Sequence, residues 1–491
     1  MSDTADVIVI GSGFGGAVAA ARLVEAGKSV ILLERGPWRD TIATRSAGIK
    51  GRQPLPCEAS FLSLIRSVHP KWGPKRLTLN KYGYLEMFED AGIKVPVTSN
   101  VGGGSQIWAA VIDRPKAGYW DNRANGLSDA TMSPHYERLA AQLGATQPKD
   151  TRKIANHTDH AWQGADFFTQ LDSDEQPPMG ILFQGESTVV DENGISRQPF
   201  APGQENGKFG SPGATKSTLD ALFLIPAIRK GMDLRALHEV RRIQKTGTGF
   251  TVTARNLKGR RKVTLTAAKV IVAAGTMNTN ALLLKATQAG DLPVMPALGQ
   301  GVGMNGDLLG KWATDGRDAS LGPPVQGRVK ITGHEAAAYV LLSTAETPPL
   351  PFFMRKKALE KARSTLGLVA MSQDASDGRI WLENGRFRFA FHMSGSPSYA
   401  ATMQAYDALG QASGRKVKYS KEQVVSAHPC GGCRVSDGPQ TGVVDGRGQV
   451  HGCAGLYVAD AAALPQSLGV PPSLSIAAWA AHVATEILSE T

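Results

Sequence analysis

Residues 6–36 read "DVIVIGSGFGGAVAAARLVEAGKSVILLERG", and this stretch decides the fold of the chain. It begins with a continuous apolar run, Val7 to Ile10, which is typical of a parallel strand buried on both faces. A helical pattern follows over residues 17–26, and "SVILLE", residues 29–34, has the composition of a second buried strand. The order strand, turn, helix, strand predicts an α/β fold built on a mainly parallel sheet.

The turn between the first strand and the helix carries Gly11, Gly13 and Gly16 at the spacing G-x-G-x-x-G. Gly11 permits the tight turn, Gly13 lets the backbone approach a pyrophosphate, and Gly16 lets helix and strand pack closely. The helix N-terminus then offers unpaired N–H groups to the phosphates. Glu34 follows Gly16 by 18 residues, near the spacing at which an acid binds ribose hydroxyls. The complete arrangement favours dinucleotide binding over a purely structural turn, and it leaves NAD and FAD both open.

The composition is that of an ordinary globular protein. The 491 residues suit two domains folded together, with 42% hydrophobic and 20% charged residues. Lys and Arg exceed Asp and Glu by 54 to 43, a net charge of +11 that suggests attraction to anionic partners. The basic runs are scattered, however, and no nucleic-acid motif lies between them. Solvated surfaces are therefore favoured over nucleic-acid binding.

Several sequence features bear on location and on rival chemistries. The N-terminus shows no charged leader with an apolar core, and no apolar run approaches the roughly 20 residues of a membrane span. Four cysteines are too few for a secreted disulfide scaffold, so we expect a reduced, cytoplasmic protein. His157 and His160 have a metal-ligand spacing but no evident third ligand, so no metal site is expected. The absence of G-x-S-x-G weighs against an ordinary serine hydrolase.

The rest of the chain continues the sheet and then changes character. Residues 270–273 form another buried strand that runs into Gly275 and a helix. Residues 311–424 combine alternating strand patterns with helices, which suits the roof of a substrate site. Within that block, residues 350–354 are mostly apolar and lead directly into a basic helix. That helix could dock on a membrane surface or cover the opening of an apolar substrate site, although packing on its own domain is the favoured interpretation.

The stretch "HPCGGC", residues 428–433, has three interpretations of its own. Cys430 and Cys433 could form a redox dithiol, but such a pair belongs at the head of a helix in a small βαβ domain. A metal site of four cysteines would need the distant Cys57 together with Cys453. Sulfur chemistry is therefore the minor interpretation, and His428 becomes the residue of interest.

Several segments taken together resemble the glucose-methanol-choline (GMC) family of FAD-dependent oxidoreductases, and most closely its cholesterol-oxidase branch. The segments are residues 6–36, "NVGGGS", "GKFGSPGATKSTLDALFL", "ALHEV", "VIVAAGTMNTNALLL", "GVGMNGD" and nearly all of residues 428–488. The resemblance implies a Rossmann-like FAD-binding domain with an interleaved α+β substrate-binding domain. The implied boundaries are 1–115, 205–310 and 425–491 for the FAD-binding segments, 116–204 for a substrate-side segment, and 311–424 for the substrate-binding domain.

The resemblance also implies which residues hold FAD. The ADP half would lie on Gly11, Gly13, Gly16 and Glu34, and the flavin and its phosphates along the turn Gly102, Gly103, Gly104, Ser105. The remaining implied contacts are Val240 at the adenine, Asn305 near the flavin ring, Asp460 at the ribityl chain, and Gly469, Val470 and Pro471 around the pyrimidine edge. No histidine stands in the glycine turn where some relatives attach flavin covalently, so the FAD is expected to be non-covalent.

His428 matches the active-site histidine of the family. Oxidising an alcohol to a ketone moves a hydride to flavin N5 while a proton leaves the hydroxyl, and imidazole can accept that proton near neutral pH. Where the family commonly has asparagine or a second histidine, this chain has Pro471, which offers neither a polar side chain nor an N–H. The acid used by the cholesterol-oxidase branch is unplaced, with Glu335 and Glu360 as candidates.

The leading hypothesis is oxidation of a bulky, apolar alcohol such as a sterol, terpenoid or alicyclic compound, with oxygen or an electron carrier as acceptor. Pro471 motivates an alternative, in which flavin drives desaturation or C=C reduction beside a ketone and His428 donates a proton. An electron-transfer protein without substrate turnover and a charge-driven membrane or nucleic-acid binder are the rivals from other classes.

Overall fold

A computed structural model describes most of the chain. The described residues are 2–56, 64–72, 75–146, 168–169, 177–185, 187–201, 207–313, 322–344, 350 and 352–490. Cys57, His157 and His160, which entered the metal hypotheses, lie outside the described residues.

A seven-stranded sheet forms the base of the molecule. Its central strand β1 (Thr4–Ile10) pairs in parallel with β2 (Val30–Leu33) on one side and β15 (Lys262–Val272) on the other. The strand order is β12-β2-β1-β15-β14-β13, and β26 also pairs with β15. The remaining members are β12 (Asp233–Arg235), β13 (His238–Lys245), β14 (Phe250–Asn256) and β26 (Leu456–Val458). The strands predicted at residues 7–10, 29–34 and 270–273 are confirmed.

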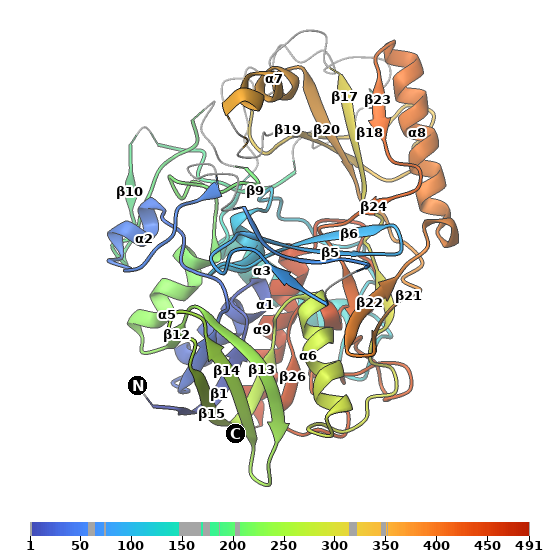
Figure 1. Cartoon of the computed structure of the whole chain (residues 1–491). Coiled ribbons are helices and arrows are strands. Elements are labelled where there is room, and N and C mark those ends of the chain that lie inside the picture. The colour runs from blue at the N-terminus through green and yellow to red at the C-terminus, as the bar shows by residue number, and fades with distance from the viewer. Residues whose placement is uncertain are drawn as a thin grey trace.

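Helices pack on this sheet where the apolar pattern predicts them. α1 (Phe14–Glu25) lies beside α9 (Ser473–Ser489), and α3 (Asp129–Gln142) also contacts α9 (Figure 1). α6 (Thr276–Gln288) follows β15 and contacts β13. The N-terminal and C-terminal ends of the chain thus build one layer of the same domain.

A second sheet stands over the first at the far end of the molecule. Its order is β23-β17-β20-β19-β18-β8, and α8 (Pro397–Ser413) packs on one face (Figure 1). Its strands are β8 (Phe168–Thr169), β17 (Leu308–Ala313), β18 (Val325–Ile331), β19 (Val340–Thr344), β20 (Thr365–Ala370) and β23 (Val417–Tyr419). The arrangement agrees with the sheet and helices expected from residues 311–424.

A third, five-stranded sheet lies between these two layers, where Figure 1 shows β5 and β6. Its strands are β3 (Ile65–His69), β4 (Leu77–Thr78), β5 (Leu85–Asp90), β6 (Ile93–Thr98) and β24 (Val424–Val425). Smaller elements are α2 (Ile42–Ser46), α5 (Ile225–Arg229), β7 (Ala145–Thr146), β9 (Met179–Gly180), β10 (Val189–Val190), β11 (Ser196–Arg197), β16 (Gln300–Gly303), β21 (Gly378–Glu383), β22 (Arg386–Ala390) and β25 (Cys430–Gly432).

The helix α7 (Phe352–Arg363) contacts β20 of its own domain, but it leaves most of its surface exposed. Packing on its own domain was the favoured interpretation, yet Ala362 is the only buried side chain among its described residues. Phe353 is 72% exposed and Met354 48% exposed. The helix carries a run of basic residues, and charged side chains are costly to bury. Among the described helices, none has the length and apolar character needed to cross a membrane.

Gly16 is where α1 presses against β1. A Cβ on Gly16 would overlap the carbonyl oxygen of Gly11, whereas a Cβ on Gly13 would meet open space. We therefore predict that Gly16→Ala lowers the free energy of unfolding by about 1–3 kcal/mol or more, as overpacking does. Gly13→Ala, measured by urea unfolding under the same conditions without cofactor, should leave it unchanged. Equal stability of the two variants would contradict this account of the contact.

Candidate active site

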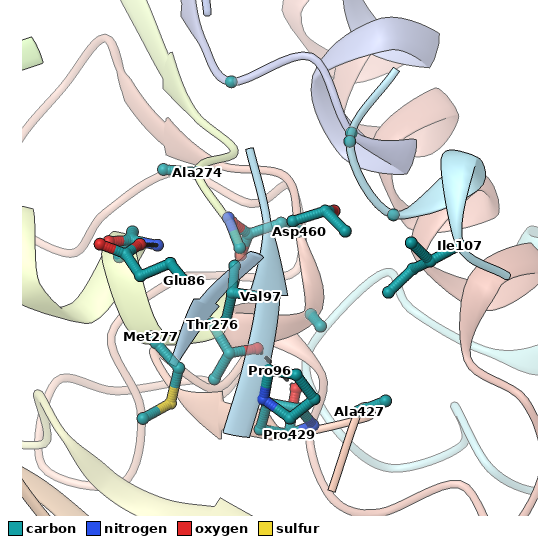
Figure 2. A pocket seen from close by; sticks show the side chains of 18 of the residues that line it. Glu86, Pro96, Val97, Ile107, Ala274, Thr276, Met277, Ala427, Pro429 and Asp460 are labelled. Atoms are coloured by element: carbon teal, nitrogen blue, oxygen red, sulfur yellow. Dashed lines mark hydrogen bonds between the residues drawn. The ribbon is translucent and has the colours of Figure 1, made fainter. Parts of the chain in front are cut away.

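One cavity of about 750 Å³ runs between the three sheets. Its floor is the glycine turn after β1, and its far wall is the second sheet. Figure 2 shows the middle of this cavity, where Thr276 of α6 meets Pro429, and Asp460 and Ile107 approach from other sides. The Thr276 hydroxyl donates to the Pro429 carbonyl at 2.6 Å, which ties α6 to the segment that carries His428.

The floor of the cavity suits an anionic dinucleotide. Gly13, Gly104 and Gly275 each face open space in which an added Cβ would meet no atom within 4 Å. Gly13 is also the N-cap of the twelve-residue helix α1, which has no side-chain cap and no acid in its first turn. The N–H groups and dipole of that helix are therefore available to phosphate oxygens. The residues present fit the pyrophosphate of FAD.

The second strand brings Glu34 to the same floor. Its carboxylate accepts hydrogen bonds from the Ser12 backbone at 3.1 Å and hydroxyl at 2.7 Å, and from the Gly36 backbone at 2.7 Å. Glu34 is thus held at the edge of the cavity, together with Val240 of β13. Both predicted residues therefore line the cavity.

Positive charge surrounds this end of the cavity. The buried carboxylate of Glu86 pairs with Arg35, with His69 at 2.9 Å and with Arg76 at 3.5 Å. Burial opposes ionisation of Glu86, but these cations together hold its pKa well below the usual range. Arg66 lies behind them, and burial, followed by the charge of Arg35, lowers its pKa to about 10. Arg76 also pairs with Glu239 at 2.6 Å. The basic side chains that line this end still outnumber the acids Glu34, Glu86 and Glu239, which favours a bound anion; they are Arg35, Lys75, Arg76, Arg241 and Lys285.

Asp460 borders the cavity at the end of β26. Its carboxylate accepts hydrogen bonds from the Gly275 backbone and the Ala462 backbone, at 2.8 and 2.9 Å, and from the Thr279 hydroxyl. Burial raises its pKa to about 6, because these bonds offset only part of the cost of a buried charge. Asp460 therefore joins α6 to β26 beside the glycine turn.

The far part of the cavity is apolar. The face of the second sheet turned away from α8 supplies aliphatic side chains, and the segment after the Gly102–Ser105 turn supplies the opposite wall. The apolar lining from these two sources is Leu309, Val325, Leu341, Val369, Met371, Ile107, Trp108, Ala109 and Val111. Ser343 adds a hydroxyl, but it donates to the Pro324 carbonyl at 3.0 Å. This chamber suits a hydrophobic ligand.

His428 borders the same cavity and is hydrogen-bonded behind by a carboxylate. Its Nδ1 lies 2.9 Å from Oδ1 and 3.0 Å from Oδ2 of Asp307. Burial alone would lower the pKa of His428, but the charge and hydrogen bond of Asp307 outweigh it and raise that pKa. Pro471 lines this cavity as well, so His428 and Pro471 belong to one site.

Other predicted residues lie behind the lining rather than in it. Gly11, Gly103 and Gly104 line the cavity, whereas Gly16, Gly102, Ser105, Asn305, Gly469 and Val470 do not. Asn305 accepts from the Leu468 and Gly469 backbones, both at 2.9 Å, and donates to the Val470 carbonyl at 3.0 Å. The amide of Asn305 thus positions the loop that carries Pro471.

Neither acid proposed from the sequence borders the cavity. Glu335 and Glu360 are exposed and lie outside the cavity lining. Among the described residues, the acids that line it are Glu34, Glu86, Glu239, Asp307 and Asp460. Sequence reasoning missed Asp307, although it stands two residues after Asn305 in "GVGMNGD". No local pattern indicated that Asp307 pairs with His428, which lies 121 residues further along the chain.

The three cysteines in the described part of the chain are buried and unreactive. Cys430, Cys433 and Cys453 are buried free thiols. Burial raises the pKa of Cys430 to about 12 and that of Cys433 well above its usual value, so neither forms a reactive thiolate. Among the described residues, no group of three His, Cys, Asp or Glu side chains could hold a metal ion.

Comparison with known proteins agrees with this site. Residues 6–53 match the family described as FAD binding domain, and residues 350–480 match GMC oxidoreductase. A cholesterol oxidase of Mycobacterium tuberculosis is 24% identical over 551 positions, covering 98% of this chain and 90% of the relative. A long-chain-alcohol oxidase of Arabidopsis thaliana is 23% identical over 549 positions, covering 98% and 66%.

The fold agrees with solved structures too. A fungal aryl-alcohol oxidase superposes with a TM-score of 0.62 at 15% identity, covering 100% of both chains. The predicted architecture, a Rossmann-like FAD-binding domain combined with an α+β substrate-binding domain, is therefore confirmed. With the matched segments and the glycine cradle between the sheets, the chain is similar to the GMC family of FAD-dependent oxidoreductases.

Proposed function

We propose that this protein oxidises a bulky, apolar alcohol, such as a sterol, terpenoid or other alicyclic compound. The observation that carries the proposal is the apolar chamber, which is continuous with the glycine cradle and is bordered by His428. A polycyclic substrate would bury its rings against the aliphatic face of the second sheet. Its hydroxyl would then lie toward the polar end of the chamber.

The chemistry requires a base as well as an oxidant. The carbinol carbon loses a hydride, the hydroxyl loses a proton, and a ketone remains. When bound, FAD supplies the acceptor for the two electrons of that hydride. His428 accepts the hydroxyl proton at Nε2, because its Nδ1 is engaged by Asp307. The names of the similar cholesterol and long-chain-alcohol oxidases support an alcohol as the substrate.

We propose that FAD binds without a covalent link, because the turn Gly102 to Ser105 holds no histidine. Gly11, Gly13 and the N-terminus of α1 would receive the pyrophosphate, with Gly16 keeping α1 close to β1. Glu34 and Val240 would bind the adenosine, Gly103 and Gly104 the flavin side, and Asp460 the ribityl chain. Gly102, Ser105, Asn305, Gly469 and Val470 would shape these contacts from behind the lining.

A second candidate function follows from Pro471. Since this residue cannot donate a hydrogen bond, a hydroxyl in the chamber has fewer partners beside His428. Desaturation beside a ketone, or C=C reduction with His428 as proton donor, would depend less on such a partner. For alcohol oxidation or desaturation the electron acceptor, oxygen or a carrier, is left open, whereas C=C reduction would need an electron donor instead. The buried free thiols support the expected reduced, cytoplasmic setting.

We also propose a weak contact between α7 and anionic membrane surfaces. The helix carries Arg355, Lys356, Lys357, Lys361 and Arg363 against the single acid Glu360. Exposed Phe353 and Met354 stand at its start. Basic side chains beside exposed apolar ones are typical of helices that lie in the membrane interface.

Substrate class is tested by the flavin spectrum of the purified holoprotein under anaerobic conditions. We predict that alicyclic alcohols bleach the flavin absorbance, and that His428→Asn slows bleaching by about 10²–10⁴-fold, the usual contribution of a general base. His392→Asn, at an exposed position, is the matched control. Reaction with ketones or enones alone would replace alcohol oxidation by the second candidate function.

The cofactor cradle predicts a separate outcome for Gly13→Val. The new side chain would enter the open space at the helix N-terminus, so the FAD content of the purified variant should fall to about one-tenth or less, a loss equivalent to roughly 1.4 kcal/mol. Gly247→Val places the same side chain in open space at a position outside the cavity lining, and its FAD content should be normal. Full FAD content in the Gly13 variant would place the cofactor elsewhere.

The α7 contact is tested by co-sedimentation with vesicles. We predict binding to vesicles containing phosphatidylserine, weakening with salt, and no binding to pure phosphatidylcholine. Lys356→Glu with Lys357→Glu should weaken binding at least about 30-fold, at roughly 1 kcal/mol for each basic residue. Lys258→Glu with Arg260→Glu makes the same charge change elsewhere on the surface and should have little effect. An equal loss in both variants would indicate net charge rather than α7.

A further inference from the structure

We propose that Asp307 is the positioning residue for His428. By accepting the proton of Nδ1, it holds the imidazole in the tautomer whose unprotonated nitrogen, Nε2, is presented to the cavity. The inference rests on the proposed function for its catalytic meaning, but the tautomer and its cause are properties of the protein itself.

The geometry requires this tautomer. Asp307 is 1% exposed, and both its carboxylate oxygens lie within 3.0 Å of Nδ1. A carboxylate only accepts hydrogen bonds, so Nδ1 must be the donor. The same carboxylate accepts from the Ser426 hydroxyl at 2.8 Å and the Ala427 backbone at 3.1 Å. Asp307 therefore accepts one hydrogen bond from each of the three consecutive residues 426–428.

The turn that carries Asp307 is itself held in place. Asp374 accepts hydrogen bonds from the Met304 backbone at 2.8 Å and the Gly306 backbone at 3.0 Å. Asn305 and Gly306 both have positive φ, at 55° and 59°, so the chain turns sharply here. The Asn305 amide then binds the loop at 468–470. The carboxylate of Asp307 is consequently aimed at His428 by a turn that is fixed on both sides.

The surroundings leave Asp307 as the charge that acts on His428. Tyr399 and Tyr406 of α8 and Cys430 of β25 are titratable groups that also interact with the charge of Asp307, and burial raises the pKa of each. They stay neutral near pH 7. The charge of Asp374 is engaged by the donors of its own turn and of Ser376 and Ser467. Removing the Asp307 charge would therefore leave burial as the dominant influence on the imidazole.

The sign of the pH effect follows from this arrangement. Asp307 raises the pKa of His428, so the neutral imidazole needed to accept a proton builds up only above the ordinary pKa of histidine. Without the carboxylate, the protonated form loses its partner while burial still disfavours it, and the midpoint of the titration moves to lower pH. The same loss frees the ring to adopt the other tautomer or to rotate.

Pro471 gives this arrangement its importance. A site with a polar side chain at that position would have a second group to orient a substrate hydroxyl. Here the loop supplies a proline, and the loop itself is bound through its backbone to Asn305. Proton transfer then depends on one imidazole, and its orientation depends on Asp307.

The first test uses the unaltered holoprotein with ¹⁵N-labelled histidine. We expect the neutral form of His428 to carry its proton on Nδ1, as read from the ring nitrogen shifts, and the residue to titrate above the ordinary pKa of histidine. Assignment of the resonance comes from its loss in His428→Asn. A neutral form protonated on Nε2 would overturn the proposal, whatever the protein oxidises.

The second test compares Asp307→Asn with Asp307→Glu and with the control Asp407→Asn, whose carboxylate is 53% exposed on α8. We expect Asp307→Asn to lower the titration midpoint of His428 and to move the pH profile of flavin bleaching to lower pH. At the plateau of that profile, bleaching by the alcohol should be slower by about 10²-fold, the cost of a misplaced reacting group. Asp307→Glu should recover part of the midpoint, and Asp407→Asn should match the unaltered protein.

The outcomes distinguish a failure of the proposed function from a failure of the positioning role of Asp307. If no alcohol bleaches the flavin but the titration midpoint falls in Asp307→Asn, the proposed function fails and the positioning role stands. If alcohols react and both the midpoint and the pH profile are unchanged in Asp307→Asn, the positioning role fails. A variant that does not fold leaves the tautomer measurement in the unaltered protein as the deciding result.

Discussion

Buried carboxylates hold this site together, because a charge taken out of water must be matched by hydrogen-bond donors. Asp307 takes its donors from residues 426–428, Asp374 from the turn at 304–306 and from Ser467, and Asp460 from Gly275 and Thr279. Each carboxylate therefore joins segments that are far apart in the chain. The cavity lies among these junctions, so its shape depends on them more than on any single strand.

The two ends of the cavity differ in the polarity of the groups that line them. The cofactor end is made of backbone N–H groups, glycines and a surplus of cations, which suit an anionic dinucleotide. The substrate end is made of aliphatic side chains from a sheet whose other face packs on α8. Burial of apolar surface can bind a large substrate there, but because the hydrophobic effect is non-directional it does little to orient that substrate. His428, with Asp307 behind it, supplies a directional contact between the two ends.

Much of the fold could be predicted from the sequence because its signals are local. The apolar runs of β1, β2 and β15 and the glycines after β1 are readable within a few residues, and the structure has these elements where they were predicted. His428 was found through its resemblance to a family motif, and it borders the cavity. The helix α7 contacts β20 of its own domain, but its large exposed face could not be read from the apolar start of the segment.

The sequence by itself determined the strand β1, the glycine turn and the helix α1, because each follows from side-chain size and periodicity along a short stretch. It also identified Pro471 as a position without a hydrogen-bond donor, which is a property of the residue alone. Only the tertiary structure decided what stands behind His428. Asp307 and Asp374 lie in loops with no periodic pattern, and their partners are set by how distant turns pack, which no local spacing encodes.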